Sequence, residues 1–170
     1  MEEQKIDIQQ AKKDVLIMSD RLASLYYFMI KSMLEELPEE SVERIVRRAI
    51  DNYGQDCGNL AQEKVKAMDL PLILKNYALV NDLPSIGWEK KRVETGDDNV
   101  KVTEVRYCPL AVKWKELDFE KWGRIYCYVD QAKYSGYNNA LTCYHDKNVL
   151  DGDDFCVVRI VKDEQENGNG

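Results

Sequence analysis

The chain has 170 residues, about the length of one domain, and its 44% hydrophobic and 32% charged residues are typical of a soluble globular protein. A formal net charge of −7 excludes the broad basic surface that binding to nucleic acid or anionic lipid requires. The N-terminus lacks the basic and then apolar run of a secretory signal, and no apolar run approaches the roughly 20 residues of a membrane span, so we expect a cytoplasmic protein with no membrane partner. Five cysteines without CxxC spacing indicate reduced thiols rather than a disulfide framework.

Helical periodicity dominates the first part of the chain, after a polar start at residues 1–10. From Ala11 to Leu34, apolar residues recur at helical spacing on two sides of the same helix. Such a helix is either central in the fold or buried in a homodimer. A proline at position 38 separates it from a second long helix.

Two glycines one turn apart, Gly54 and Gly58, lie near the apolar stripe of this second helix. They predict either close approach of another helix backbone or room for a ligand, because glycine has no side chain. Asp69 is then expected to cap a third helix that has Pro71 in its first turn and ends near Asn81.

The second part of the chain reads as two hairpins flanking a helix. Two runs rich in β-branched and aromatic residues surround the turn at Gly96, and Pro109 stops the second run because it cannot continue a ladder. A loop holding Trp114 follows. The expected elements are strands at 86–95 and 100–107, a helix at 118–135, and strands at 139–146 and 155–162.

This order predicts an α+β fold, in which N-terminal helices and the later helix pack on one face of an antiparallel sheet. We expect a single domain over residues 1–170, with a helical subregion at 11–81, a ββαββ subregion at 84–162 and a disordered tail at 164–170.

Candidate chemistry concentrates on cysteines and one acid. Cys127 and Asp130 lie one turn apart on the predicted helix, beside its buried stripe, so both could face a cavity between helix and sheet. Equally, Cys127 could be a small core residue and Asp130 a solvated acid. Cys108 stands where a strand ends, and Cys156 alternates with apolar residues on the last strand, which by itself indicates a core position.

A metal site has weak support. Cys143 and His145 are two residues apart on a strand, so they point the same way and could be two ligands. No close ligand pair such as CxxC or HxxxH accompanies them, and we expect no metal or other cofactor. GxSxG, GxGxxG, P-loop and HExxH motifs are also absent from the sequence.

Short motifs in the second half together form a pattern. Cys-Pro follows a strand, then come Trp-x-Arg-x-Tyr-Cys-x-x-Asp, an asparagine eight residues later, and a closing Gly-Asp-Asp-x-Cys. The matching residues are Cys108, Pro109, Trp122, Arg124, Tyr126, Cys127, Asp130, Asn138, Gly152, Asp153 and Cys156. This pattern resembles the L-2-amino-thiazoline-4-carboxylic acid hydrolase family, which is itself similar to ligand-binding domains related to vinyl reductases.

The resemblance implies hydrolysis of a small cyclic amidine-like ring, with 2-aminothiazoline-4-carboxylate as the namesake substrate. Water would add at the carbon between nitrogen and sulfur, expelling the thiolate and giving a carbamoyl-cysteine. Cys108 or Cys127 would be the nucleophile, Asp130 the base or orienter, and Asn138 a polar donor. The substrate-binding residues would include Asn138, Arg124, Tyr126, Cys156, Asp153 and Gly152.

Two other classes of function remain open. The same residues could line the pocket of a non-catalytic, sensor-like domain that binds a small molecule. A purely structural dimer built on the first helix would have no pocket. Convergence of Cys108, Cys127, Asp130 and Cys156 on one cavity would favour the hydrolase or the small-molecule-binding domain over the structural dimer.

Overall fold

The structure is a computed structural model that describes residues 7–80, 83–84 and 86–163. Residues 1–6, the expected helix end at Asn81 and the predicted tail at 164–170 lie outside the described residues. The elements are α1 (Ile8–Glu36), α2 (Glu39–Lys66), α3 (Leu74–Tyr77), the 3-10 helix η1 (Ala78–Val80), β1 (Glu89–Val93), β2 (Val100–Tyr107), α4 (Pro109–Glu116), α5 (Glu120–Tyr126), α6 (Val129–Tyr137), β3 (Leu141–Lys147) and β4 (Cys156–Lys162).

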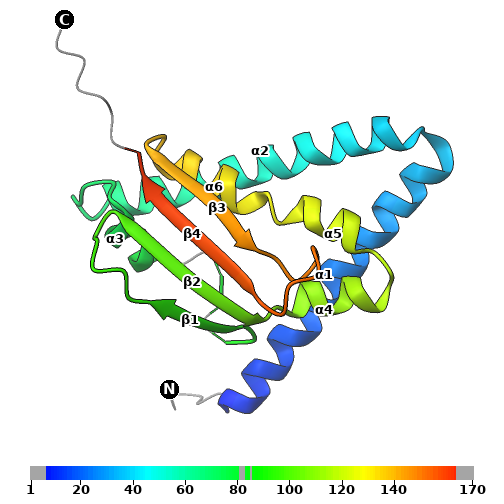
Figure 1. Cartoon of the computed structure of the whole chain (residues 1–170), viewed down its shortest axis with the longest axis horizontal. Helices are drawn as coiled ribbons and strands as arrows, with labels where there is room; N and C mark the ends of the chain where they lie inside the picture. The colour runs from blue at the N-terminus through cyan, green and yellow to red at the C-terminus, as the bar shows by residue number, and fades with distance from the viewer. Residues whose placement is uncertain (1–6, 81–82, 85, 164–170) are drawn as a thin grey trace, which may run out of the picture.

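The four strands form one antiparallel sheet in the order β1-β2-β4-β3. α6 lies behind the sheet in Figure 1 and α2 packs against α6, while α1 and α2 form a long hairpin that extends beyond the sheet. This arrangement confirms the predicted α+β fold. Among the described residues, no helix combines the length and the apolar character needed to cross a bilayer.

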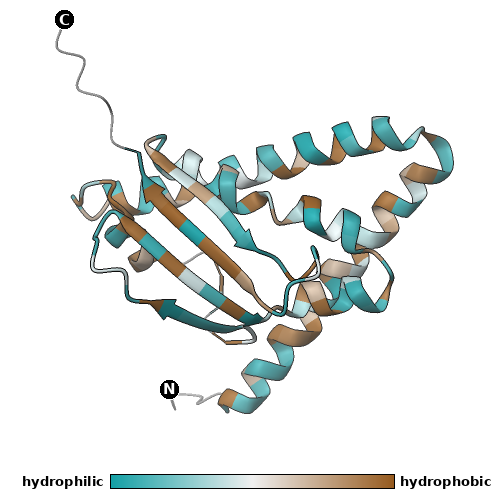
Figure 2. Ribbon diagram, in the orientation of Figure 1, coloured by the Kyte–Doolittle hydropathy of each residue, from teal (hydrophilic) through white to brown (hydrophobic). Residues whose placement is uncertain are grey.

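The strand register places specific side chains on the face that the helices cover. Thr103 and His145 both pair with Val158 across the sheet, and Lys101 and Cys143 both pair with Ile160. Because directly paired residues point to the same side, these six side chains share the inner face. Figure 2 shows hydrophobic and hydrophilic residues alternating along β2, whereas β4 is mostly hydrophobic.

The glycines of α2 are sites of close helix approach, which confirms the first of their two predicted roles. A Cβ at Gly58 would lie 2.3 Å from the carbonyl oxygen of Lys133 in α6, and one at Gly54 would lie 2.5 Å from Cβ of Ala132. The two backbones therefore nearly touch. This contact sets the distance between α2 and α6.

The predicted continuous helix at 118–135 is wrong, because the chain breaks into α5 and α6 at Cys127 and Tyr128. The amides of Tyr128 and Asp130 bond to carbonyls only three residues back, which tightens the turn. The two segments also pack against different clusters. Trp122 of α5 joins the core with α1 and α4, whereas Tyr134 of α6 packs with the sheet.

Three other element predictions need correction. The expected loop around Trp114 is helix α4, which starts with Pro109 in its first turn and buries Trp114. Asp69 does not cap a third helix. It adopts a left-handed conformation (φ 55°) just after α2, and the chain stays non-helical until α3 begins at Leu74. The first strand is also shorter than predicted, at Glu89–Val93.

Candidate functional site

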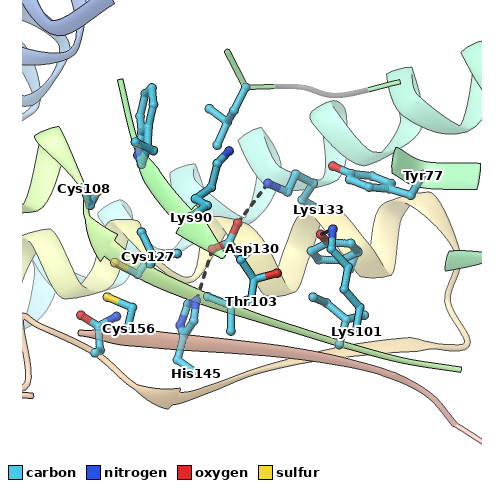
Figure 3. A pocket seen from close by; sticks show the side chains of 17 residues that line it. Tyr77, Lys90, Lys101, Thr103, Cys108, Cys127, Asp130, Lys133, His145 and Cys156 are labelled. Atoms are coloured by element: carbon cyan, nitrogen blue, oxygen red, sulfur yellow. Dashed lines mark hydrogen bonds and ion pairs between the residues drawn. The ribbon is translucent and has the colours of Figure 1, made fainter. Parts of the chain in front are cut away.

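A pocket of ≈ 200 Å³ lies between α6 and the inner face of the sheet. Cys108, Cys127, Asp130 and Cys156 all line it, although they come from three different parts of the chain. Figure 3 shows the three sulfur-bearing side chains gathered at one end of this pocket. The structure thus brings the predicted thiols and the carboxylate together.

Asp130 is held between two basic side chains. Lys133, one turn further along α6, lies 3.0 Å from Oδ1, and Nε2 of His145 on β3 lies 3.2 Å from Oδ2 (Figure 3). Burial alone would raise the pKa of the Asp130 carboxyl, but the charge of Lys133 and the hydrogen bond from His145 lower that pKa far below its ordinary 3.8. Asp130 is therefore a carboxylate at any physiological pH.

The other side of the His145 ring fixes its tautomer. Its side chain is only 2% exposed, and a guanidinium nitrogen of Arg124 lies 3.4 Å from Nδ1. Because guanidinium can only donate, Nδ1 is the acceptor, and the hydrogen on Nε2 is donated to Asp130. Arg124 is itself anchored by Asp151 at 2.7 Å. Arg124, predicted as a substrate-binding residue, thus supports His145 and does not line the pocket.

The thiols at the other end of the pocket are neutral. Burial raises the pKa of Cys127 to about 12, despite a hydrogen bond with the Asn148 side chain. Burial also raises the pKa values of Cys108 and Cys156. Since a thiolate and not a thiol is the strong nucleophile, these cysteines form an uncharged, polarisable wall near neutral pH.

Ammonium and phenol groups line the opposite end. The Lys101 ammonium on β2 lies 3.3 Å from the Tyr134 hydroxyl and 6.0 Å from the ring centre of Tyr77. Lys90 on β1 adds a second ammonium at the pocket wall. Figure 3 shows Tyr77 and Lys101 beyond Asp130, away from the cysteines. The pocket is therefore polar and basic at one end and sulfur-rich at the other.

Two other predicted site residues lie away from this pocket. Asn138 ends α6, where its side chain donates to the Leu72 carbonyl (2.6 Å) and accepts from the Ala140 amide (2.9 Å). Tyr126 packs its ring edge-to-face on Tyr26 in the core around α1, with a ring-centre distance of 5.4 Å. These contacts stabilise the fold and do not involve the pocket.

In the closing Gly-Asp-Asp-x-Cys motif, Cys156 lines the pocket directly, whereas Gly152 and Asp153 act on it indirectly. Gly152 adopts φ +99° in the turn before β4, a conformation that suits glycine. The Asp153 carboxylate accepts a hydrogen bond from the backbone amide of Asn148 (2.8 Å). The Asn148 side chain reaches the pocket and bonds to Cys127, so the motif positions a lining residue.

The weak metal candidates are divided between two environments. Cys143 is buried in the hydrophobic cluster around Tyr137, while His145 pairs with Asp130. Within residues 7–80, 83–84 and 86–163, no group of three or more His, Cys, Asp or Glu side chains is placed to hold a metal ion.

Several lining residues escaped the sequence analysis. Lys133 could have been found as the partner of Asp130 three residues away on one helix face. Lys101 and Thr103 alternate with valines on a strand, which is the signal of a shared face, and Asn148 has no local signal at all. Because lysine is usually a surface residue, Lys101 and Lys133 were not predicted to line a pocket.

Comparison with known proteins adds two findings. One similar solved structure is a trafficking protein particle complex subunit 3 from Naegleria fowleri covalently bound to palmitic acid, with 17% identity, a TM-score of 0.53, and coverage of 87% of this chain and 96% of that chain. At this identity the likeness concerns the fold alone. No curated protein matches the chain. A model of the L-2-amino-thiazoline-4-carboxylic acid hydrolase family matches residues 18–160, so the chain belongs to that family.

Proposed function

We propose that this protein is a hydrolase that opens a small cyclic amidine-like ring, of the 2-aminothiazoline-4-carboxylate type, by adding water. The main support is the meeting of Asp130, its two basic partners and three thiols around one small pocket in a chain of this family. A volume of ≈ 200 Å³ lies below the roughly 300–1,000 Å³ of pockets for drug-sized ligands, so it suits a single small ring.

The polarity of the pocket suggests how such a substrate lies. Its carboxylate would bind at the end with Lys101 and the Tyr134 hydroxyl, because ammonium and phenol groups donate to carboxylates. Its ring sulfur would lie against the neutral thiols of Cys108, Cys127 and Cys156. The carbon between sulfur and nitrogen would then sit near Asp130, with the amidine nitrogens donating to the carboxylate.

The chemistry of this proposal uses Asp130 as an acceptor and cysteine as a neutral neighbour. A carboxylate with a lowered pKa is a weak base, so Asp130 would chiefly orient the attacking water and take its proton as the new C–O bond forms. That proton would then pass to the sulfur as the C–S bond breaks, and the second proton of the water would move to the ring nitrogen as the C=O bond of the carbamoyl product forms. Cys127, with a pKa of about 12, would remain a neutral thiol. It would stabilise the departing sulfur and would not attack the ring.

A test compares two aspartate variants of the full chain. Asp130→Asn keeps the shape of the side chain and should lower turnover of 2-aminothiazoline-4-carboxylate at least a hundredfold, in the range typical of a lost acid–base group. Asp146→Asn is the matched control, since Asp146 pairs with Arg159 on the outer surface, and it should retain activity. Wild-type turnover equal to that of Asp130→Asn would refute the proposal.

One observation favours a second function, a non-catalytic domain that binds a small molecule. The pKa of the Cys127 thiol is raised and the pKa of Asp130 is lowered. Neither pKa therefore lies near neutral pH, where the pKa of an acid–base catalyst usually lies. Such a domain would gain thermal stability with the ring compound but form no product. A palmitoyl chain like that of the similar solved structure suits this pocket poorly, because an apolar tail would desolvate Asp130 and Lys133.

The setting expected for this activity is the cytoplasm. All five cysteines are free thiols, as a reducing compartment favours.

A further inference from the structure

Asn148 is a buried polar residue that lines the pocket beside the thiols. It directly follows β3, only 2% of its surface is exposed, and its side chain bonds to Cys127. Burying an amide without partners destabilises a fold, so a buried asparagine is usually held by hydrogen bonds. The partners of Asn148 therefore show which atom of its amide faces the pocket.

The oxygen of the Asn148 side chain is occupied within the turn that follows β3. Its Oδ1 accepts a hydrogen bond from the backbone amide of Leu150 at 2.9 Å. Since a backbone amide can only donate, this contact distinguishes the oxygen from the nitrogen. The backbone of Asn148 is also held, because its amide donates to the Asp153 carboxylate at 2.8 Å and its carbonyl accepts from the Asp151 amide at 2.9 Å. The side chain is thus fixed with its nitrogen, Nδ2, toward the pocket.

The Nδ2 atom of Asn148 carries two hydrogens, and the thiol uses at most one of them. The bond between Asn148 and Cys127 favours the charged form of the thiol, so the amide is the donor and the sulfur is the acceptor. An asparagine amide has two donor hydrogens. The second hydrogen can therefore be donated to a ligand in the pocket.

A fixed donor at this end of the pocket suits the atom that leaves during ring opening. In the proposed orientation the ring sulfur lies against the thiols, where Nδ2 of Asn148 also lies. When the C–S bond breaks, its electron pair stays on the sulfur. A preorganised N–H group stabilises the charge that develops there, and it does so better than thiols, which are weak donors.

We propose that Nδ2 of Asn148 donates a hydrogen bond to the ring sulfur of the substrate and holds it as it departs. This inference rests on the proposed hydrolysis and names the contact that recognises the leaving atom. No proton moves from Asn148, so the proton balance of the hydrolysis is unchanged. Asn138, the donor expected from the sequence, has the same turn, but its Nδ2 donates to the Leu72 carbonyl at 2.6 Å, outside the pocket.

Binding of two stable ring analogues tests the contact without any turnover. 2-Oxooxazolidine-4-carboxylate and 5-oxoproline share ring size and carboxylate, but the first has an oxygen and the second a methylene group at the position of the leaving atom. In calorimetry the wild type should bind the oxygen ring about two- to tenfold more tightly, as one neutral hydrogen bond predicts. Asn148→Asp keeps an oxygen for Leu150 but loses the donor, so it should abolish this preference.

Two further variants and a kinetic measurement complete the test. Asn138→Asp makes the same change outside the pocket and should keep the preference. Asn148→Ala also lacks the donor, and it decides the question if Asn148→Asp does not fold. With 2-aminothiazoline-4-carboxylate, Asn148→Asp should lower kcat about a hundredfold, as expected for one lost preorganised donor, and should change KM little.

The possible results separate this inference from the proposed hydrolysis. A wild type that binds both analogues equally, or Asn148 variants that keep the preference, would overturn the inference alone. A wild type that shows the preference but no turnover would refute the hydrolysis and support the contact between Asn148 and a ring heteroatom. A wild type that binds neither analogue would overturn both.

Discussion

The contact between α2 and α6 gives a sharp prediction at Gly58. A Cβ there would lie 2.3 Å from the Lys133 carbonyl oxygen, 2.7 Å from the Tyr137 amide nitrogen and 2.9 Å from the Gly136 carbonyl carbon. Ordinary contact begins near 3.4 Å, so relief requires a shift of about 3.4 − 2.3 = 1.1 Å. All three atoms belong to the backbone of α6, and no side chain can rotate away.

Two opposing effects decide the stability of Gly58→Ala. Alanine in place of glycine inside a helix gains about 1 kcal/mol. Overpacking a tight contact costs about 1–3 kcal/mol, and moving a whole helix belongs at the upper end. We therefore expect a net loss of about 1–2 kcal/mol in the free energy of unfolding, or roughly 2–8 °C in Tm for a chain of this size.

Thermal and urea unfolding measure this loss. Asn59→Ala, at the exposed neighbouring position, gains helix propensity without a contact and should be slightly stabilising. Because α6 carries Asp130 and Lys133 into the pocket, Gly58→Ala should also weaken ligand binding. A Gly58→Ala variant as stable as Asn59→Ala would show that the two helices can separate freely, and the reasoning from close approach would fail.

Three further predictions concern the pocket. The folded-state pKa of Asp130 is lowered by Lys133 and His145, so its stabilising contribution is present above its unfolded pKa of about 3.9 and is lost as pH falls through the folded value. The Tm difference between wild type and Asp130→Asn should thus be constant above about pH 5 and shrink below about pH 4. Alkylation of Cys127, followed by mass spectrometry, should be slow at pH 7 and still accelerate above pH 9, whereas a plateau near pH 8 would contradict the raised pKa of about 12. Lys101→Met should raise KM for the carboxylate substrate about tenfold or more while leaving a ring analogue without the carboxylate unaffected; equal effects on both would reject the proposed orientation.

The convergence of the cysteines on one pocket could be predicted because it depends on simple periodicity. Cys127 and Asp130 are one turn apart beside a buried stripe, and Cys156 alternates with apolar residues on a strand. In the structure Cys127 caps the end of α5 and Asp130 lies in the first turn of α6, yet both line the pocket because they are only three residues apart. The α+β class follows from the same patterns together with the turn at Gly96, whereas the pairing of β2 with β4 was not predicted.

The break between α5 and α6 and the positions of Asn148 and Lys101 could not be predicted in the same way. The break at Cys127 and Tyr128 arises because α5 and α6 pack on different clusters, and local sequence carries no sign of that division. Asn148 reaches the pocket only because the turn held by Asp153 directs it there. Lys101 faces inward by strand alternation, yet a lysine among valines is equally compatible with an outward-facing position until the register is known.

Asp130 serves both the stability of the pocket and its proposed chemistry, and the two roles can be separated. Lys133 has a side chain only 7% exposed, with the Asp130 carboxylate 3.0 Å away. Removing one partner of a fully buried pair costs about 3–5 kcal/mol, and the 28% exposure of Asp130 places this pair below that range. Asp130→Asn is therefore expected to lose stability as well as turnover. Adding Lys133→Met replaces the pair by neutral side chains of similar size, which should restore much of the Tm. If Asp130 orients the water and accepts its proton, the double variant stays inactive despite its recovered stability. Recovered turnover would instead show that Asp130 is only a structural partner of Lys133.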